Sequence, residues 1–112
     1  MSRDPIKITA ERMAAERIDE VRPIVDGYIA RNCVPAGDAA LFPHCTDDGW
    51  SLGLAERGEP GYWALRTPAL PHELMGMAQA YASELNRLLF GHDAFEALEI
   101  VTSSMGAGRV GA

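Results

Sequence analysis

The chain has 112 residues, of which 47% are apolar and 23% charged, and a formal net charge of −6. This length suits one domain with its own apolar core. The negative charge disfavours nucleic acid as a partner, because that binding needs clustered Lys and Arg against phosphates. No apolar run approaches the ~18–20 residues of a membrane span, and residues 1–8 lack the apolar core of a signal peptide. We therefore expect a single cytoplasmic domain without membrane contact.

A first helix is predicted over residues 9–31, with Thr9 as its N-cap. Its apolar positions recur in steps of four and three and form one stripe: Ala14, Ile18, Val21, Val25 and Tyr28. Pro23 interrupts this pattern, since an interior proline removes a backbone donor and costs ~3 kcal/mol. The stripe continues past Pro23, so we expect an amphipathic N-terminal helix that is kinked near this residue.

The middle of the chain contains one hairpin signal, after a long loop. Residues 50–55 alternate large and small side chains, residues 61–66 do the same, and Gly58 lies in the turn between them. If the turn centres on Gly58 and Glu59, Leu54 pairs with Trp63. This register places the large side chains together on one face of a two-stranded antiparallel hairpin. A lone ribbon is marginally stable, so that face must pack on the helices.

Two further helices are predicted, at about 72–90 and 94–104, and together they form a C-terminal helical hairpin. Pro71 suits the first position of the earlier helix, and Gly91 suits its C-terminal end. Asp93 opens the later helix, with Glu96 three residues on in a capping-box arrangement. Residues 106–112 show no pattern and are expected to form a flexible tail, which leaves an ordered core of about 8–105.

The predicted fold class is therefore α+β, in the order helix, long loop, hairpin, helix, helix. The predicted core draws on every element and includes these residues: Ile18, Val21, Val25, Tyr28, Trp50, Leu52, Leu54, Trp63, Leu65, Leu74, Ala78, Tyr81, Leu85, Leu88, Leu98 and Val101.

The residue types suited to a metal site are Cys33, His44 and Cys45. Zinc requires three or four converging thiolate or imidazole ligands, and His72 or Asp47 could be a fourth. Two features argue against zinc as a cofactor: the ligands lack the usual paired spacing, and neighbouring residues in an extended chain point apart. The simpler interpretation is two buried, reduced thiols.

No catalytic motif is present. Ser103 and Ser104 fall near a helix C-terminus, where the helix dipole does not activate a hydroxyl, so capping or back-bonding roles are expected. The glycines after Met105 neither follow a strand nor open a helix, so they form no phosphate-binding loop.

Surface recognition remains the favoured function. Tyr62 and Arg66 are predicted on the outer face of the hairpin, beside small residues, where they form a candidate contact patch. Met75 and Met77 are further candidates, because methionine-rich surfaces adapt to partners. Core packing is the alternative role for both methionines.

These observations predict a small acidic protein without enzymatic activity. It would act as an adaptor, regulator or inhibitor by binding another protein, or by binding a second copy of itself as a homodimer. Nine of the ten basic residues are Arg, which suggests a GC-rich bacterial or phage genome. One alternative is a metal- or thiol-dependent module built on Cys33, His44 and Cys45. Another is a helix-turn-helix-like DNA-binding regulator, which the acidic last helix disfavours.

Overall fold

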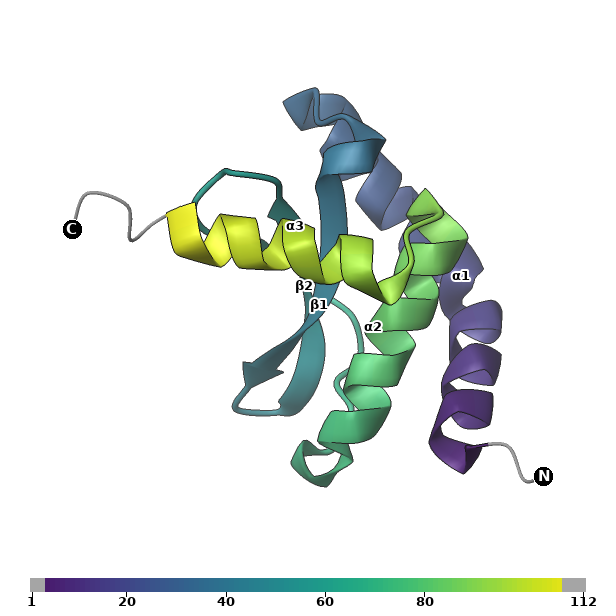
Figure 1. Ribbon diagram of the computed structural model, residues 1–112. Coiled ribbons are helices and arrows are strands. Elements are labelled where there is room, and N and C mark those ends of the chain that lie inside the picture. Colours follow the sequence, from purple (N-terminus) through teal and green to yellow (C-terminus); the bar gives the residue numbers. More distant parts are fainter. Residues whose placement is uncertain (1–3, 108–112) are drawn as a thin grey trace.

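The computed structural model describes residues 4–107 (Figure 1). Its elements follow in this order: α1 (Pro5–Asn32), β1 (Ala39–Thr46), β2 (Gly49–Glu56), β3 (Trp63–Ala64), α2 (Met75–Phe90) and α3 (Ala94–Ala107). Short 3₁₀ turns at Ala36–Asp38 and His72–Leu74 precede β1 and α2. The α+β class and the order of the predicted elements are confirmed, and the sheet has three strands instead of two.

Helix α1 begins earlier than predicted. Its N-cap is Asp4, whose carboxylate accepts a hydrogen bond from the backbone N–H of Ile6, and Pro5 occupies the first helical position. The prediction of Thr9 as the cap was therefore wrong. The helix is uninterrupted to Asn32 although Pro23 lies within it. Cys33 ends the helix in the left-handed region, with φ 54°.

The predicted long loop contains a strand, which is the main correction to the fold. β1 pairs with β2 in antiparallel register from Ala39 opposite Glu56 to Thr46 opposite Gly49. A two-residue connection, Asp47 and Asp48, joins these strands. Gly49 has φ 132°, and a Cβ there would collide with the carbonyl of Leu70, so the close approach of the chain requires glycine.

The predicted register between residues 50–55 and 61–66 is confirmed. Leu54 lies opposite Trp63 and Gly53 opposite Ala64, although only two residues form β3 itself. Farther along, backbone hydrogen bonds join Leu65 to Leu52 and Leu70 to Trp50. The large side chains of β2 lie on one face, as the alternation predicted.

The main core lies between that face and helices α1 and α2. Its buried members are Ala10, Ala14, Val21, Val25, Val34, Ala39, Leu41, Leu52, Leu54, Leu65, Tyr81, Ala82 and Leu85. Tyr28 and Trp63 stack at its border, with ring centroids 4.4 Å apart. Most of the predicted core residues therefore pack as expected. Leu74 is an exception, because it is 40% exposed in the turn before α2.

Helix α3 covers the opposite face of the sheet, where it crosses β1 and β2 in Figure 1. This contact is small: Ala97 and Ile100 pack on Ala40, with Val101 beside them. Leu98 was predicted in the core but is 63% exposed. The predicted cap of α3 is confirmed, since the carboxylate of Asp93 accepts a hydrogen bond from the N–H of Glu96. Of the predicted tail, residues 108–112 lie outside the described residues.

The free edge of β1 is protected by side chains from the other elements. Asn86 on α2 accepts from the N–H of Leu41 and donates to its carbonyl, and a ring nitrogen of His92 lies 2.9 Å from the carbonyl of Ala39. Pro43, two residues after Leu41, has no N–H to satisfy. Over about half of the length of β1, the edge is therefore protected from pairing with another strand.

Candidate functional site

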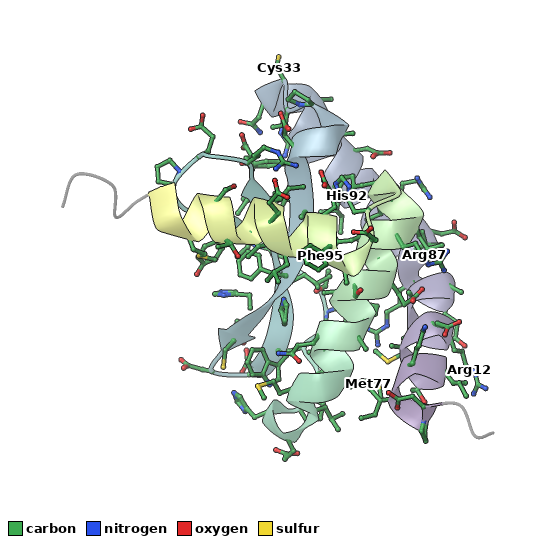
Figure 2. All side chains as sticks on the ribbon, in the orientation of Figure 1. Arg12, Cys33, Met77, Arg87, His92 and Phe95 are labelled. Carbon is green, nitrogen blue, oxygen red and sulfur yellow. The ribbon has the colours of Figure 1, made fainter. Side chains whose placement is uncertain are left out.

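The residues predicted for a metal site do not come together. Cys33 lies at the end of α1, at the top of Figure 2, whereas His44 and Cys45 lie toward the opposite end of β1, next to its turn into β2. Within residues 4–107, no group of three or more His, Cys, Asp or Glu side chains is arranged to hold a metal ion. Both thiols are free and exposed, so the prediction that they are buried was wrong.

The predicted contact residues separate into two places. Tyr62 is 48% exposed, and its ring lies 5.1 Å from that of Phe42 and 4.9 Å from that of His44, measured between centroids. These three rings form an aromatic cluster on the face of the sheet that α3 covers only in part. Arg66 is exposed beyond the end of β3.

The two methionines lie at the start of α2 and differ from each other. Met75 is 51% exposed, whereas Met77 packs against the main core (Figure 2). Met77 therefore belongs to the packing of the domain, and the alternative of a core role fits it. Met75 is available at the surface, beside the exposed Leu74.

The two most exposed large apolar side chains of the described residues, Phe95 and Leu98, lie on α3, and Leu98 was predicted in the core. Phe95, which Figure 2 labels, is 82% exposed, and Leu98 and Met105 are 63% and 40% exposed. At 100° per residue, Leu98 and Met105 fall within ~20° of each other, and Phe95 falls ~60° from Leu98. We call these three residues the α3 ridge. They share one side of the helix, away from the buried Ile100.

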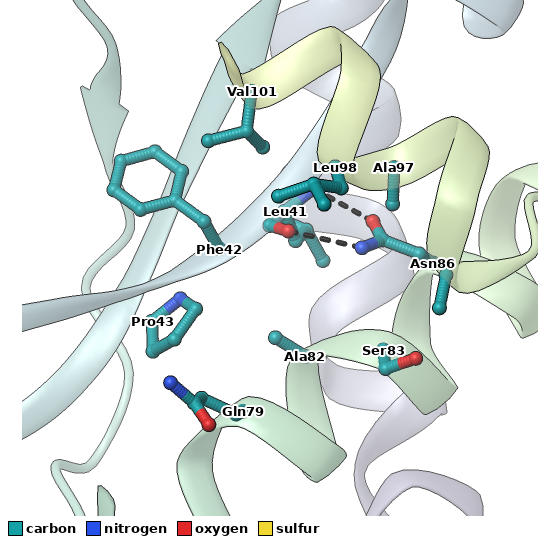
Figure 3. A pocket seen from close by; sticks show the side chains of 11 residues that line it. Leu41, Phe42, Pro43, Gln79, Ala82, Ser83, Asn86, Ala97, Leu98 and Val101 are labelled. Carbon is teal, nitrogen blue, oxygen red and sulfur yellow. Dashed lines mark hydrogen bonds between the residues drawn. The ribbon is translucent and has the colours of Figure 1, made fainter. Parts of the chain in front are cut away.

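A groove lies beside the α3 ridge, between α3, α2 and β1 (Figure 3). Its volume is about 380 Å³. Its lining is mainly apolar: Leu41, Phe42, Pro43, Gln79, Ala82, Ser83, Asn86, Ala94, Ala97, Leu98 and Val101. A second hollow of about 420 Å³ follows the outer side of α3, and Leu98 lines both. Leu98 therefore stands between two concave apolar regions.

The floor of the groove has its polar groups satisfied. Figure 3 shows the amide of Asn86 directed at Leu41, with Oδ1 2.6 Å from the backbone nitrogen and Nδ2 2.9 Å from the carbonyl oxygen. A ligand that fills the groove need not supply partners for these groups. Gln79 and Ser83 are the polar side chains at its rim.

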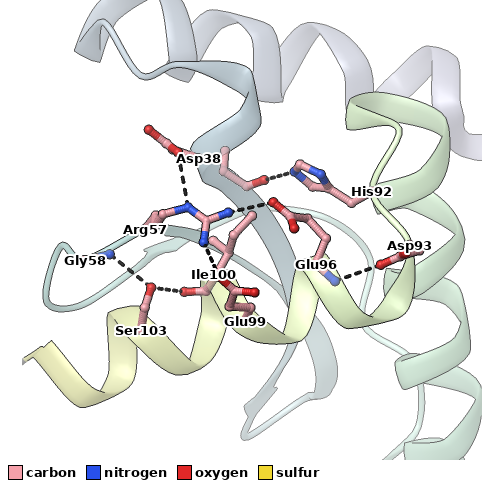
Figure 4. Close-up of polar contacts among 10 residues, drawn as sticks. Asp38, Arg57, Gly58, His92, Asp93, Glu96, Glu99, Ile100 and Ser103 are labelled. Atoms are coloured by element: carbon pink, nitrogen blue, oxygen red, sulfur yellow. Dashed lines mark hydrogen bonds and ion pairs between the residues drawn. The ribbon is translucent and has the colours of Figure 1, made fainter.

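Polar contacts hold α3 in place on the other side of the helix (Figure 4). The guanidinium of Arg57 lies 3.3 Å from Asp38, 2.6 Å from Glu96 and 2.9 Å from Glu99. Burial acts to lower the pKa of Arg57, but the hydrogen bond to Asp38 and the charges of the two glutamates outweigh it, and the net shift is upward. Arg57 therefore remains a cation that ties α3 to the end of β2.

Two serines near the end of α3 bind the segment between β2 and β3. Ser103 donates to the carbonyl of Ile100 and accepts from the N–H of Gly58, so the predicted back-bonding role is confirmed. The hydroxyl of the buried Ser104 lies within 2.8 Å of the carbonyls of Glu59 and Gly61, and its single proton serves one of them at a time. Both hydroxyls are therefore engaged in docking α3.

Each described histidine contacts a backbone carbonyl or an aromatic side chain. A nitrogen of His72 lies 2.7 Å from the carbonyl of Thr46, and His92 is buried against Ala39. Because a carbonyl only accepts, the bonded nitrogen in each case carries the proton. No pair of nucleophile and base is formed by the hydrogen bonds found among residues 4–107.

Comparison of the chain with protein-family models, with curated proteins and with solved structures gives no match. Among the described residues, no helix is both long enough and apolar enough to cross a membrane. Function must therefore be inferred from the surface geometry.

Proposed function

We infer that the chain is a small acidic protein-binding module, without enzymatic activity, which acts as an adaptor, regulator or inhibitor through the α3 ridge and the groove beside it. The observation that carries this proposal is the exposure of Phe95 and Leu98 next to an apolar groove. Single exposed apolar residues are common on protein surfaces. A contiguous apolar surface that includes a hollow is typical of an interaction site.

The distribution of charge supports the same function. The three carboxylates of Asp38, Glu96 and Glu99 surround one guanidinium, that of Arg57, and α3 carries no basic residue within its described part. An apolar centre with a charged border is the usual composition of a protein interface. The acidic border also disfavours the alternative of a DNA-binding regulator, in which α3 would be the recognition helix.

The proposal is tested by affinity capture from lysate of the source cells, with quantification of each captured protein. The test variant is Phe95→Ser/Leu98→Ser, and the control is Ile6→Ser, which also removes an exposed apolar side chain but on α1. A partner that is retained by the control and lost with the α3 variant supports the proposal. Equal capture by both variants overturns it.

A further inference from the structure

The face of the sheet that carries α3 has room for a second helix. Strands of eight residues span about 26 Å, whereas a helix with its side chains is about 10 Å wide. Helix α3 packs at the end of β1 that contains Ala40. From Phe42 to Thr46 this face is not covered by a helix: Phe42 and His44 are half-buried with the ring of Tyr62 against them, and Ala64 is exposed on β3. The open half is therefore about one helix wide.

The same face of the molecule carries both a ridge and a groove. The α3 ridge projects Phe95, Leu98 and Met105, and the groove borders α3 on the side that faces α2 and β1. A twofold axis beside α3 would place the ridge of each copy in the groove of the other. Interfaces of this isologous kind are the most frequent among homo-oligomers.

The charges on α3 border the ridge on its flank away from the groove. Glu99 is ~40° from Phe95 and ~100° from Leu98 around the helix, and Glu96 is ~160° from Leu98. Both carboxylates are bound to Arg57 on the flank that faces the end of β2 (Figure 4). The ridge and the groove lining are uncharged, which fits another uncharged apolar face better than a basic peptide.

We propose that the occupant of this face is a second copy of the chain, so that α3 of each protomer lies beside α3 of the other across the open half of its sheet. This inference rests on the proposed function, because it names the partner of the same surface. The hydrogen-bonded amide of Asn86 permits it, since no unpaired polar group of the groove floor would be buried in the dimer.

The expected dimer is modest in affinity. A face of one helix length by two helix widths measures about 20 Å by 20 Å and buries on the order of 400 Å² per copy, below the ~800 Å² of a standard interface. We therefore expect a dissociation constant of roughly 1–100 µM. Salt should strengthen the dimer, because each copy has a net charge of −6 and salt screens their repulsion.

The test is sedimentation velocity of the full chain over a concentration series from about 1 µM to about 1 mM, at low and high salt. The test variant is Leu98→Glu, which places a charge at the centre of the ridge on a residue that is already exposed. Ile6→Glu is the matched control, because Ile6 is 43% exposed on α1, which packs on the other face of the sheet. Phe95→Glu provides an independent second variant, and thermal melts verify that all variants fold.

The proposal predicts that the wild type and Ile6→Glu dimerise with the same constant and that dimerisation is stronger at high salt. Both α3 variants should weaken it at least tenfold. A wild type that is monomeric throughout overturns the inference, as does a dimer that persists in Leu98→Glu and Phe95→Glu. A dimer that weakens with salt also contradicts the uncharged interface.

Failure of this inference is distinguishable from failure of the proposed function. If the wild type is monomeric but the α3 variants lose a partner captured from lysate, the ridge binds a different protein. In that case the proposed function stands and the second copy is the wrong occupant. If the wild type is monomeric and capture is unchanged by the α3 variants, both are wrong.

Discussion

Asn86 completes the hydrogen bonding of Leu41 as a neighbouring strand would: its side-chain oxygen accepts from the N–H of Leu41 and its side-chain nitrogen donates to the carbonyl of the same residue. Both hydrogen bonds are buried, and the two residues that they join are 45 positions apart in the sequence. One side chain therefore attaches α2 to the sheet and covers part of the free edge of β1.

Replacing Asn86 with Leu, which has a similar shape, should destabilise the domain by about 2–4 kcal/mol, because two buried backbone groups lose their partners. Urea denaturation at neutral pH measures this change. Gln79→Leu is the control, because Gln79 is exposed at the rim of the groove. A stability of Asn86→Leu within about 0.5 kcal/mol of the wild type would show that the hydrogen bonds do not hold the edge.

The orientation of α3 can be tested with two alanine variants. Ile100 is fully buried, so Ile100→Ala should cost about 2–4 kcal/mol. Leu98→Ala should change the free energy of unfolding by less than about 0.5 kcal/mol, because Leu98 is 63% exposed. These values should be measured at a protein concentration where the chain is monomeric. The reverse order of effects would mean that α3 is rotated relative to the sheet.

Gly53 makes room for the ring of Phe42, which also lines the groove. A Cβ at residue 53 would lie 2.5 Å from the ring, so Gly53→Ala should cost about 1–3 kcal/mol as the ring is displaced. Gly37→Ala is the control, because nothing lies within 4 Å of its added Cβ. Adding Phe42→Leu to Gly53→Ala should recover part of the loss in a double-mutant cycle. Strictly additive effects would contradict this contact.

Arg57→Gln should lower the melting temperature, because the cluster of Asp38, Glu96 and Glu99 loses the guanidinium that pairs with all three carboxylates. The difference from the wild type should shrink in high salt, which screens the remaining repulsion. Arg66→Gln provides a comparison, since Arg66 is exposed and lies outside this cluster. If both variants melt alike at low salt, the cluster contributes nothing measurable to the docking of α3.

Two tyrosines should make the domain sensitive to alkaline pH. Burial raises the pKa of Tyr28, and its hydrogen bond to Glu56 raises it further. Burial also raises the pKa of Tyr81, partly offset by the charge of Arg17, whose guanidinium carbon lies 5.9 Å from the ring centroid without forming a well-aligned hydrogen bond. The folded state thus keeps both phenolic protons to higher pH than the unfolded state, whose tyrosines titrate near 10.

The stabilisation from these phenols is therefore complete below about pH 10 and is lost as the pH rises through the folded pKa values. Tyr81→Phe should retain wild-type stability at pH 7, because the hydroxyl has no hydrogen-bond partner among residues 4–107. It should also reduce the loss of stability at alkaline pH. Urea midpoints between about pH 8 and 11 measure the slope; an unchanged slope in Tyr81→Phe would contradict the shift.

Sequence periodicity predicted the helices and one strand register, but it missed β1. Proline is rare within strands, because it has no N–H to donate, and Pro43 lies within residues 39–46. It is tolerated here because β1 is an edge strand, which becomes evident only once the sheet is assembled. The start of α1 was available in the sequence, since Asp4 followed by Pro5 is a typical cap and first position.

The α3 ridge was missed for a different reason. Of the residues of α3, Leu98 and Val101 were predicted in the core. The structure instead buries Ala97, Ile100 and Ser104, and the hydroxyl of Ser104 binds backbone carbonyls there. A helix with apolar residues on two sides does not reveal which side faces inward, so the candidate site could not be located from periodicity.

The unequal size of the two apolar clusters has a consequence for the order in which the domain opens. Thirteen buried residues join α1, α2 and the sheet, whereas three hold α3. Local opening should therefore begin at α3, whose amide hydrogens should exchange faster than those of α1 and α2. Such an opening would expose Ala40 and the rest of that sheet face before the remainder of the domain unfolds, so we expect α3 to be the least stable cooperative unit among residues 4–107.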